Sequence, residues 1–339
     1  MKPLKGLALA VLALGLLGGA ALGAGGLWLR SNLAPAEAAA PDVDFEVARG
    51  ASLKAVAGQL ARRGVIRDAR AFELLARWHE LDGSLHVGEF VVSAAMPAGE
   101  ILTILSEGRV KTYEVVIPEG FRATEIAARL AAAGLVDEAE FLAIVDQPGL
   151  ASRLGVEGPG LEGYLFPETY RFPRGLSAEA VARVLVEHFL ATWAEVEPEA
   201  KRQKLSMRAV VTLASIVEKE TGAPAERPVI AAVFRNRLAR RMRLASDPTT
   251  IYGISGFDGN LRRRDLEDDT NPYNTYKIPA LPPGPIASPG ADALRAVVAP
   301  AKTGYLFFVS RNDGTHVFAR SYDEHERNVD RYQRKRRRK

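Results

Sequence analysis

Hydrophobic positions with a helical period occur twice in the same arrangement in the first half of the chain. The stretch 50–66 recurs at 120–136. In each copy a short β run, 45–47 or 113–117, precedes a glycine turn and an amphipathic helix that ends at a second glycine. This pattern predicts small βα modules over 43–141. Such modules commonly form a binding surface, and the alternative is that they only pack against the main domain.

Longer amphipathic helices dominate the rest of the pattern. It predicts four of them, at 177–196, 206–220, 225–240 and 291–298. Ser206 has the hydroxyl side chain of a helix N-cap. Alternating residues at 305–310 and 316–319 predict a β-hairpin. The stretch 158–170 is dense in glycine, proline and aromatic residues, so tertiary contacts must hold its side chains.

An uncharged segment opens the chain. Lys2 and Lys5 precede residues 6–29, which carry no charge and are long enough to span a bilayer, because about 20 apolar residues suffice. Lysines before the segment favour a cytoplasmic N-terminus. We therefore expect a cytoplasmic stub (1–5), a transmembrane helix (6–29) and an Ala/Pro-rich linker (30–42). The alternative is a cleaved signal peptide.

Composition sets wider bounds. The 339 residues are 47% hydrophobic and 25% charged, which predicts two or three folded units and excludes a largely disordered or fibrous protein. Cysteine is absent, which excludes disulfides, a cysteine nucleophile and a thiolate metal site. The net charge of +4 comes from the basic residues that end the chain, 334–339, so it does not indicate a nucleic-acid partner.

Carboxylates are the candidate chemistry, because the five histidines lack metal-ligand spacing and no serine-hydrolase, zincin, nucleotide or dinucleotide motif is present. Glu218 lies in the last turn of a predicted helix, beside the small residues Ala214 and Ser215. The helix end and apolar neighbours are expected to raise the pKa of its carboxyl, as a general acid requires. An exposed, solvated helix end is the alternative. Glu220 points about 200° away around the helix and is expected to be solvated or structural.

Six motifs resemble, in order, those of the endolytic murein transglycosylase family. They lie at 161–170, 214–221, 246–249, 273–276, 281–286 and 288–290. The resemblance implies an α+β fold class with an N-terminal transmembrane helix, small LysM-like βα modules over 43–141 and a mixed α/β catalytic domain over 142–330, followed by a basic tail (331–339). It also implies a single-pass protein of the cell inner membrane, with its N-terminus in the cytoplasm and its catalytic domain in the periplasm.

The same resemblance implies a lyase that cuts the β-1,4 bond between N-acetylmuramic acid and N-acetylglucosamine in nascent peptidoglycan. The cut would leave 1,6-anhydro ends and end strand elongation. The family's catalytic glutamate falls on Glu218. Candidate substrate-binding residues, from motif membership, are Glu162, Tyr164, Glu168, Tyr170, Ser246, Asp247, Thr249, Asn274 and Tyr276. For each of them a loop-fixing hydrogen bond is an equal alternative.

No metal or cofactor is expected. The expected partners are peptidoglycan glycan strands and peptidoglycan synthases, and no nucleic acid. An ordinary glycosidase needs two carboxylates, whereas a lytic enzyme needs one, since the sugar's own C6 hydroxyl replaces water. Two alternatives remain open: a non-catalytic, membrane-tethered peptidoglycan-binding protein and a hydrolytic muramidase. Their products would be no cleavage and reducing ends, respectively.

Overall fold

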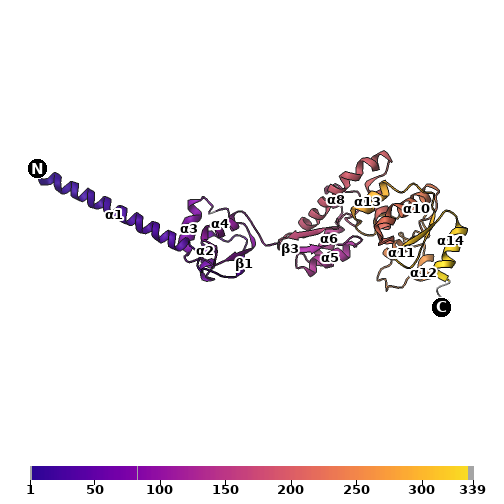
Figure 1. Ribbon diagram of the computed structural model, residues 1–339, viewed down its shortest axis with the longest axis horizontal. Helices are drawn as coiled ribbons and strands as arrows, with labels where there is room; N and C mark the ends of the chain where they lie inside the picture. Colours follow the sequence, from indigo (N-terminus) through magenta and orange to yellow (C-terminus); the bar gives the residue numbers. More distant parts are fainter. Residues whose placement is uncertain (1, 82, 335–339) are drawn as a thin grey trace. The chain divides into compact units, whose positions relative to one another are not determined.

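The computed structural model describes residues 2–81 and 83–334, and gives the backbone alone for residues 2–11 and 13. The chain forms two compact units (Figure 1). Unit 1 comprises Met1–Tyr113 and Pro173–Gly175, and unit 2 comprises Glu114–Phe172 and Leu176–Lys339. The chain thus divides between the two copies of the repeat, so the second copy belongs to unit 2.

Unit 1 has a long N-terminal helix and a small α/β core. Its elements are α1 (Lys2–Leu33), β1 (Asp42–Val47), α2 (Leu53–Arg62), α3 (Ala69–Trp78), β2 (Gly88–Ser93) and α4 (Ala98–Ser106). Strands β1 and β2 pair antiparallel and place Phe45 opposite Phe90. Both rings are fully buried beneath residues of α2, α3 and α4. Alternation along the strands therefore supplies one face of this core, as the β runs of the sequence predict.

The predicted membrane-spanning helix is wrong. A helix does form over 6–29, within α1, but no helix among the described residues is long and apolar enough to cross a membrane. In the part of this helix whose side chains the structure describes, glycine occupies positions 15, 18, 19, 23, 25 and 26 and adds no apolar side chain there. The fold class that included a transmembrane helix, and the single-pass location in the cell inner membrane, are corrected accordingly.

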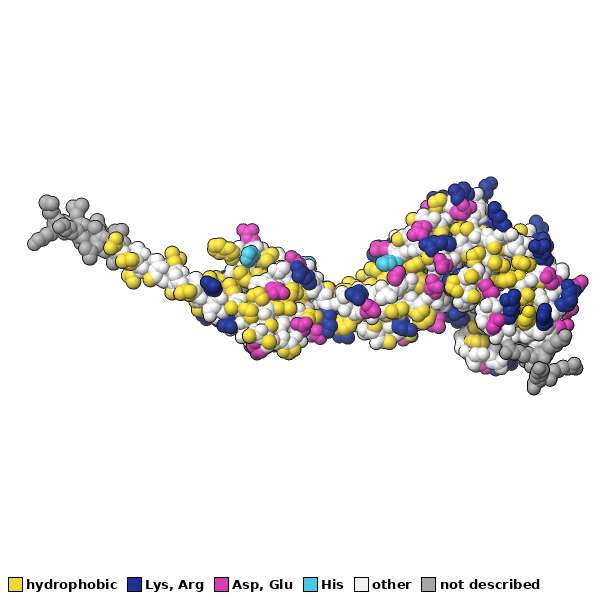
Figure 2. Space-filling view, viewed as in Figure 1, with side chains coloured by type: hydrophobic (Ala, Val, Ile, Leu, Met, Phe, Trp, Pro, Cys, Tyr) yellow, Lys and Arg dark blue, Asp and Glu magenta, His cyan; other side chains and the backbone are white. Residues whose placement is uncertain are grey.

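The leucines that the structure describes between residues 12 and 27 of α1 are exposed (Figure 2). They are Leu12, Leu14, Leu16, Leu17, Leu22 and Leu27. This part of α1 therefore adds nothing to the buried core of unit 1. Two predicted end segments lie partly outside the described residues: residue 1 and the side chains of 2–5 in the predicted stub, and 335–339 in the predicted basic tail.

The two copies of the repeat have the same backbone geometry. Gly50 and Gly120, which open the turns before α2 and α5 (Ala123–Ala132), have φ of +78° and +75°. Gly64 and Gly134, which follow the helices, have φ of +71° and +66°. Only glycine adopts this left-handed region without strain, so these glycines fix the entry and exit of each helix.

Unit 2 is mainly helical. Its elements are β3 (Tyr113–Val116), α5, α6 (Glu138–Val145), α7 (Leu150–Arg153), β4 (Thr169–Phe172), α8 (Ala178–Arg202), α9 (Met207–Glu220), η1 (Pro224–Glu226), α10 (Arg227–Ala239), α11 (Asp247–Tyr252), α12 (Arg263–Glu267), α13 (Ala291–Val298), β5 (Phe307–Ser310), β6 (His316–Ala319), α14 (Tyr322–Val329) and η2 (Asp330–Arg334). Strand β3 pairs with β4, and β5 pairs antiparallel with β6.

Helix α9 lies at the centre of unit 2. It packs against α8, α10, α11 and α13, and every residue from Val210 to Val217 is buried. Ser206 caps its N-terminus, where the side chain accepts a hydrogen bond from the backbone N–H of Ala209. The helix ends at Glu220, because Thr221 turns to an extended conformation. Two glutamates, Glu218 and Glu220, thus lie in its last turn, at the edge of the core of unit 2.

Candidate active site

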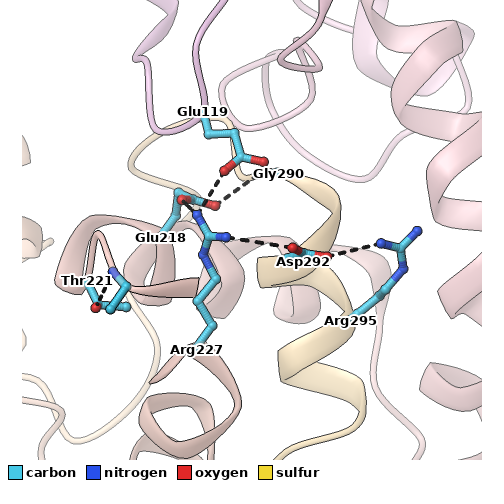
Figure 3. Close-up of polar contacts among 8 residues, drawn as sticks. Glu119, Glu218, Thr221, Arg227, Gly290, Asp292 and Arg295 are labelled. Carbon is cyan, nitrogen blue, oxygen red and sulfur yellow. Dashed lines mark hydrogen bonds and ion pairs between the residues drawn. The ribbon is translucent and has the colours of Figure 1, made fainter. Parts of the chain in front are cut away.

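Glu218 is held from two sides in the last turn of α9 (Figure 3). The guanidinium Nη2 of Arg227, at the start of α10, donates to its Oε1 at 2.6 Å. The backbone N–H of Gly290, just before α13, donates to its Oε2 at 3.1 Å. Only 5% of the Glu218 side chain and 9% of the Arg227 side chain are exposed. Both oxygens of Glu218 therefore already have donors inside the protein.

Arg227 also binds a second glutamate. Its Nη2 donates to Oε2 of Glu119 at 2.8 Å, and its Nη1 lies 3.9 Å from Oδ2 of Asp292. Glu119 comes from the turn between β3 and α5, directly before Gly120. A Cβ on Gly290 would lie 1.8 Å from Oε1 of Glu119, so this site requires glycine at 290 unless Glu119 moves.

Burial raises the pKa of Glu218, and the negative charge of Glu119 adds to the effect. The Gly290 hydrogen bond and the charge of Arg227 act in the opposite direction. The direction agrees with the expectation from the sequence. The bonding pattern, however, is that of an ionised carboxylate in a buried ion pair.

Glu220 has a different environment, two residues further on. Its Oε1 accepts a hydrogen bond from the hydroxyl of Ser246, and no lysine, arginine or histidine among the described residues forms an ion pair with it. Burial raises the pKa of Glu220 to about 7, aided by the negative charge of Asp247 and opposed by the Ser246 hydrogen bond and the charge of Arg237. Of the two roles expected for Glu220, solvated or structural, the contact with Ser246 agrees with the structural one.

The residues around Ser246 form a buried polar network. The backbone N–H of Ser246 donates to the hydroxyl of Thr275 at 2.9 Å, and Thr249 bonds to both Ser246 and Thr275. Asn274 is fully buried and donates to three backbone carbonyls, those of Asp265, Leu266 and Asp268. These contacts fix loops, and they hold Ser246 against Glu220.

Asp247 and Tyr276 extend this network to the surface. The hydroxyl of Tyr276 donates to Oδ1 of Asp247 at 2.7 Å. Asp247 is exposed, whereas its neighbour Ser246 is only 1% exposed. Of the five predicted site residues in this region, Ser246 contacts Glu220 directly, and the other four belong to the same network of loops: Asp247, Thr249, Asn274 and Tyr276. None of the described contacts joins any of them to Glu218.

Glu162 and Tyr164 lie elsewhere in unit 2. Glu162 accepts hydrogen bonds from the backbone N–H of Ala123, at the start of α5, and from the hydroxyl of Tyr252. Burial raises its pKa to about 7. Glu162 and Tyr164 line a cavity of about 160 Å³, which Tyr252 and Tyr273 also line. Tyr164 is only 1% exposed and donates to the carbonyl of Glu157, so it acts as a core residue.

Glu168 and Tyr170 are not brought to either glutamate of α9 by any described contact. Glu168 is exposed and accepts a hydrogen bond from the backbone N–H of Thr169. Tyr170 is 4% exposed, donates to the carbonyl of Phe166 and stacks on Phe172. For these two residues the structure shows loop-fixing and packing contacts.

Glu119, Arg227 and Arg237 contact or surround the candidate carboxylates, and none of them was identified from the sequence. The one available signal was position 119, which precedes the turn glycine in the second repeat copy and corresponds to Arg49 in the first. Within the described part of the chain, no group of three or more histidine or acidic side chains could hold a metal ion.

Comparisons with known proteins agree with this arrangement of motifs. Residues 45–331 match the YceG-like family. The chain is 30% identical over 328 residues to the endolytic murein transglycosylase of Bacillus subtilis (strain 168), and the match covers 92% of this chain and 91% of that relative. It is 28% identical to the enzyme of the same name from Streptococcus pneumoniae serotype 2 over 318 residues, which are 85% of this chain and 58% of that one.

A solved structure is also similar. The crystal structure of a YceG-like protein from Listeria monocytogenes superposes with a TM-score of 0.59 at 32% sequence identity. The match covers 84% of this chain and 98% of the Listeria chain. The similarity therefore extends over both units.

Proposed function

The chain belongs to the YceG-like family, and on that premise we propose that it is an endolytic murein transglycosylase with Glu218, where the resemblance places the catalytic glutamate, as its general acid. The resemblance predicted from the motifs is confirmed. The function is thus that of a lyase acting on peptidoglycan. The observation that supports Glu218 is the burial of its carboxyl in the last turn of α9, where Arg227 and Gly290 hold it in place.

Burial raises the pKa of Glu218, which suits a general acid that works near neutral pH, since more of the molecules then carry the proton to be transferred. Glu218 would donate this proton to the oxygen that links N-acetylmuramic acid to N-acetylglucosamine. The C6 hydroxyl of the muramic acid would then close on its own C1 and leave a 1,6-anhydro end. One acidic group suffices because no water molecule has to be activated.

Glu220 is the alternative acid. Burial raises its pKa to about 7, and it lies in the same helical turn. Its partner Ser246 belongs to a buried network that fixes loops, so we assign Glu220 to that network. The Arg227 and Gly290 donors of Glu218 stabilise the carboxylate that remains after its proton is transferred.

Product analysis tests the proposal. The full chain is incubated with purified glycan strands, and the fragments are identified by mass spectrometry. Fragments with 1,6-anhydro ends are expected. Reducing ends would indicate a hydrolytic muramidase, and intact strands that bind the protein would indicate a non-catalytic binding protein. Either of these results would contradict the proposal.

Unit 1 has a separate proposed role. We propose that its βα core, built from β1, α2 and β2, is a LysM-like module that engages glycan strands without performing chemistry. The repeated glycine geometry and the buried Phe45–Phe90 pair support an independent small core. Peptidoglycan synthases are proposed as partners, because an enzyme that ends strand elongation must meet strands as they are made.

A further inference from the structure

Unit 2 contains a cavity that the proposed chemistry does not use. Its volume is about 160 Å³, and Tyr252, Tyr273 and the loops 158–160 and 283–285 line it, so we call it the tyrosine cavity. Both loops consist only of glycine and proline, which leaves the space between them open. Because a cavity of about 150 Å³ can hold a benzene molecule, this one has room for a single six-membered ring.

A buried carboxyl group lines the tyrosine cavity without a cation beside it. Both oxygens of Glu162 share the backbone N–H of Ala123, at 3.2 and 3.3 Å, and the hydroxyl of Tyr252 lies 3.3 Å from Oε2. These hydrogen bonds are long, since most are about 2.7–3.0 Å. None of the ion pairs in the described part of the chain includes Glu162. Its carboxyl therefore has hydrogen-bonding capacity left for a ligand.

Two aromatic rings and one cation complete the lining. The ring centroids of Tyr252 and Tyr273 are 4.7 Å apart, and the guanidinium of Arg122 lies 5.1 Å over the Tyr252 ring. The described hydrogen bonds of Tyr273 involve only its backbone N–H, so its hydroxyl can bind a ligand. Arg208 lines the same space and donates from Nη2 to the carbonyl of Pro283. Aromatic walls with a few polar groups between them are typical of small-molecule sites.

One turn connects the tyrosine cavity to the proposed acid. Glu119 contacts Arg227, which holds Glu218. Four positions later, Ala123 donates its backbone N–H to Glu162 in the cavity. Four residues of extended chain span at most about 14 Å. A glycan strand of a few sugars can therefore reach from the acid to the cavity.

The lining suits a sugar ring. The C–H groups of a sugar pack on aromatic faces, and its hydroxyl and acetamido groups form hydrogen bonds at the edge of the ring. Burial raises the pKa of Glu162 to about 7, so near neutral pH its carboxyl can accept or donate such a bond. Two acidic side chains, Asp146 and Glu162, face one arginine, Arg208, which disfavours the terminal carboxylate of a peptide stem.

We propose that the tyrosine cavity binds one N-acetylated sugar ring of the glycan strand, away from the bond that is cut. The inference rests on the proposed function, which supplies the strand, and it adds a site that holds this strand while Glu218 acts further along it. Glu162, Tyr252 and Tyr273 are then binding residues, because they do not meet the reacting atoms.

Filling the cavity from Gly284 tests the proposal without touching Glu162. Gly284 lines the cavity, and a Cβ there would meet only the hydroxyl of Tyr273, at 3.5 Å, which is an ordinary contact. Gly284→Val should thus occupy part of the space without a steric overlap. Gly304→Val is the matched control, because Gly304 is exposed and an added Cβ would meet no atom within 4 Å. Neither glycine has a left-handed φ.

Binding is measured at the cavity itself, in the full chain labelled with 3-fluorotyrosine. The fluorine resonances of Tyr252 and Tyr273 are identified by their loss in the Tyr252→Phe and Tyr273→Phe variants. The probe is the tetramer of β-1,4-linked N-acetylglucosamine, which carries no peptide. The shift of these two resonances during a titration gives the Kd of this site, so that binding elsewhere in the chain does not contribute.

We expect both resonances to shift to saturation in the wild type. Gly284→Val should raise the Kd at least about tenfold, and Gly304→Val should leave it unchanged. Tyr273→Phe, followed at Tyr252, should raise it about three- to tenfold, because one hydrogen bond is lost. Circular dichroism first establishes folding, and Tyr273→Phe decides the matter if Gly284→Val does not fold.

The absence of shifts in the wild type, or a Kd that a folded Gly284→Val or Tyr273→Phe leaves unchanged, overturns the sugar site. Shifts caused by a free stem peptide and not by the tetramer also overturn it, since the cavity then takes a peptide. The titration does not depend on cleavage. A wild type that binds the tetramer in the cavity but releases no anhydro ends would therefore contradict the proposed function alone.

Discussion

At the scale of single residues, two glutamates in one helical turn have different partners. Glu218 shares Arg227 with Glu119, so a cation inside the protein can balance its charge after proton transfer. Glu220 has a hydroxyl as its partner, and burial dominates its pKa. The first arrangement suits a carboxyl that gives up a proton, and the second holds a loop against the helix.

The stability of the protein should depend on pH through Glu220. Its pKa is about 7 in the folded protein and 4.5 ordinarily, so the folded state binds the proton more tightly. Stability from this group is therefore complete below about pH 4.5 and is lost as pH rises through 7. Glutamine stays neutral and can still accept the Ser246 hydrogen bond. We expect Glu220→Gln to melt about 2–4 °C above the wild type at pH 8 and at the same temperature at pH 5. An equal difference at both pH values would contradict this.

Removing Arg227 should destabilise unit 2 strongly. The Arg227→Ala variant leaves Glu218 buried without its cation, and breaking one side of a buried ion pair typically costs about 3–5 kcal/mol. Arg295→Ala is the control, because Arg295 also pairs with Asp292 but is 51% exposed, and exposed pairs contribute about 1 kcal/mol or less. Urea denaturation measures both free energies of unfolding. Equal losses in the two variants would refute a structural role for the Glu218–Arg227 pair.

At the scale of elements, the segment 283–290 runs along α9 and joins its two ends. Arg208 donates to the carbonyl of Pro283, the hydroxyl of Ser215 accepts from the N–H of Ile286, and Glu218 accepts from the N–H of Gly290. The three residues of α9 that make these contacts, 208, 215 and 218, lie along one side of the helix. The proline- and glycine-rich motif 281–286 is thus a brace for the helix that carries the glutamates.

The close approach of this segment should make Gly163 irreplaceable. A Cβ at 163 would lie 2.4 Å from the Cβ of Pro285, and the residue has φ of +86°. Gly155 is the matched control, because its φ is +82° but the nearest atom to an added Cβ is 3.8 Å away. Both alanine variants should lose about 1–2 kcal/mol from the left-handed backbone. Gly163→Ala should lose at least about 1 kcal/mol more through the steric overlap, as overpacked cores do. Equal losses of unfolding free energy in the two variants, measured by urea denaturation, would contradict the close packing of Gly163 against this segment.

Helices and caps were largely predictable, because their signals are local. Neighbouring residues predict the Ser206 cap, the hairpin of β5 and β6, and the paired glycine turns. Strand β4 was not predicted, since it pairs with β3 across a long separation and lies in a stretch rich in proline and aromatic residues. The partners of Glu218 and Glu220 were also beyond the sequence. Arg227 and Ser246 lie 9 and 26 positions away and meet the glutamates only in the folded chain.

At the scale of the whole molecule, each unit has its own core, and the candidate chemistry lies in unit 2. The second repeat copy belongs to unit 2, where the carbonyl of its turn residue Gly120 accepts a hydrogen bond from Lys219 of α9. A repeat that resembles a binding module in sequence thus supports the last turn of α9 in this copy. The first copy of the repeat, which belongs to unit 1, remains the candidate for glycan binding.

Damage to the core of unit 1 should weaken substrate engagement without removing the chemistry. Phe90 is fully buried in unit 1, and replacing a buried phenylalanine by alanine typically costs about 3–5 kcal/mol. Calorimetry of Phe90→Ala should show an early transition for unit 1 and an unshifted one for unit 2. At temperatures between the two transitions, KM should rise while kcat stays within about twofold of the wild type. Loss of kcat in step with the melting of unit 1 would show that the chemistry needs both units.

The most direct test of the account compares Glu220→Gln with Glu218→Gln in one assay. Both variants keep the shape and hydrogen-bonding capacity of the side chain, and both are first checked for folding. Mass spectrometry then counts 1,6-anhydro ends released from purified glycan strands. We expect Glu218→Gln to lose about 10²–10⁴-fold in rate, the usual value of general acid catalysis, and Glu220→Gln to retain at least about a tenth of the wild-type rate. A folded Glu218→Gln that still releases anhydro ends, with Glu220→Gln inactive, would contradict the assignment and give the role of the acid to Glu220.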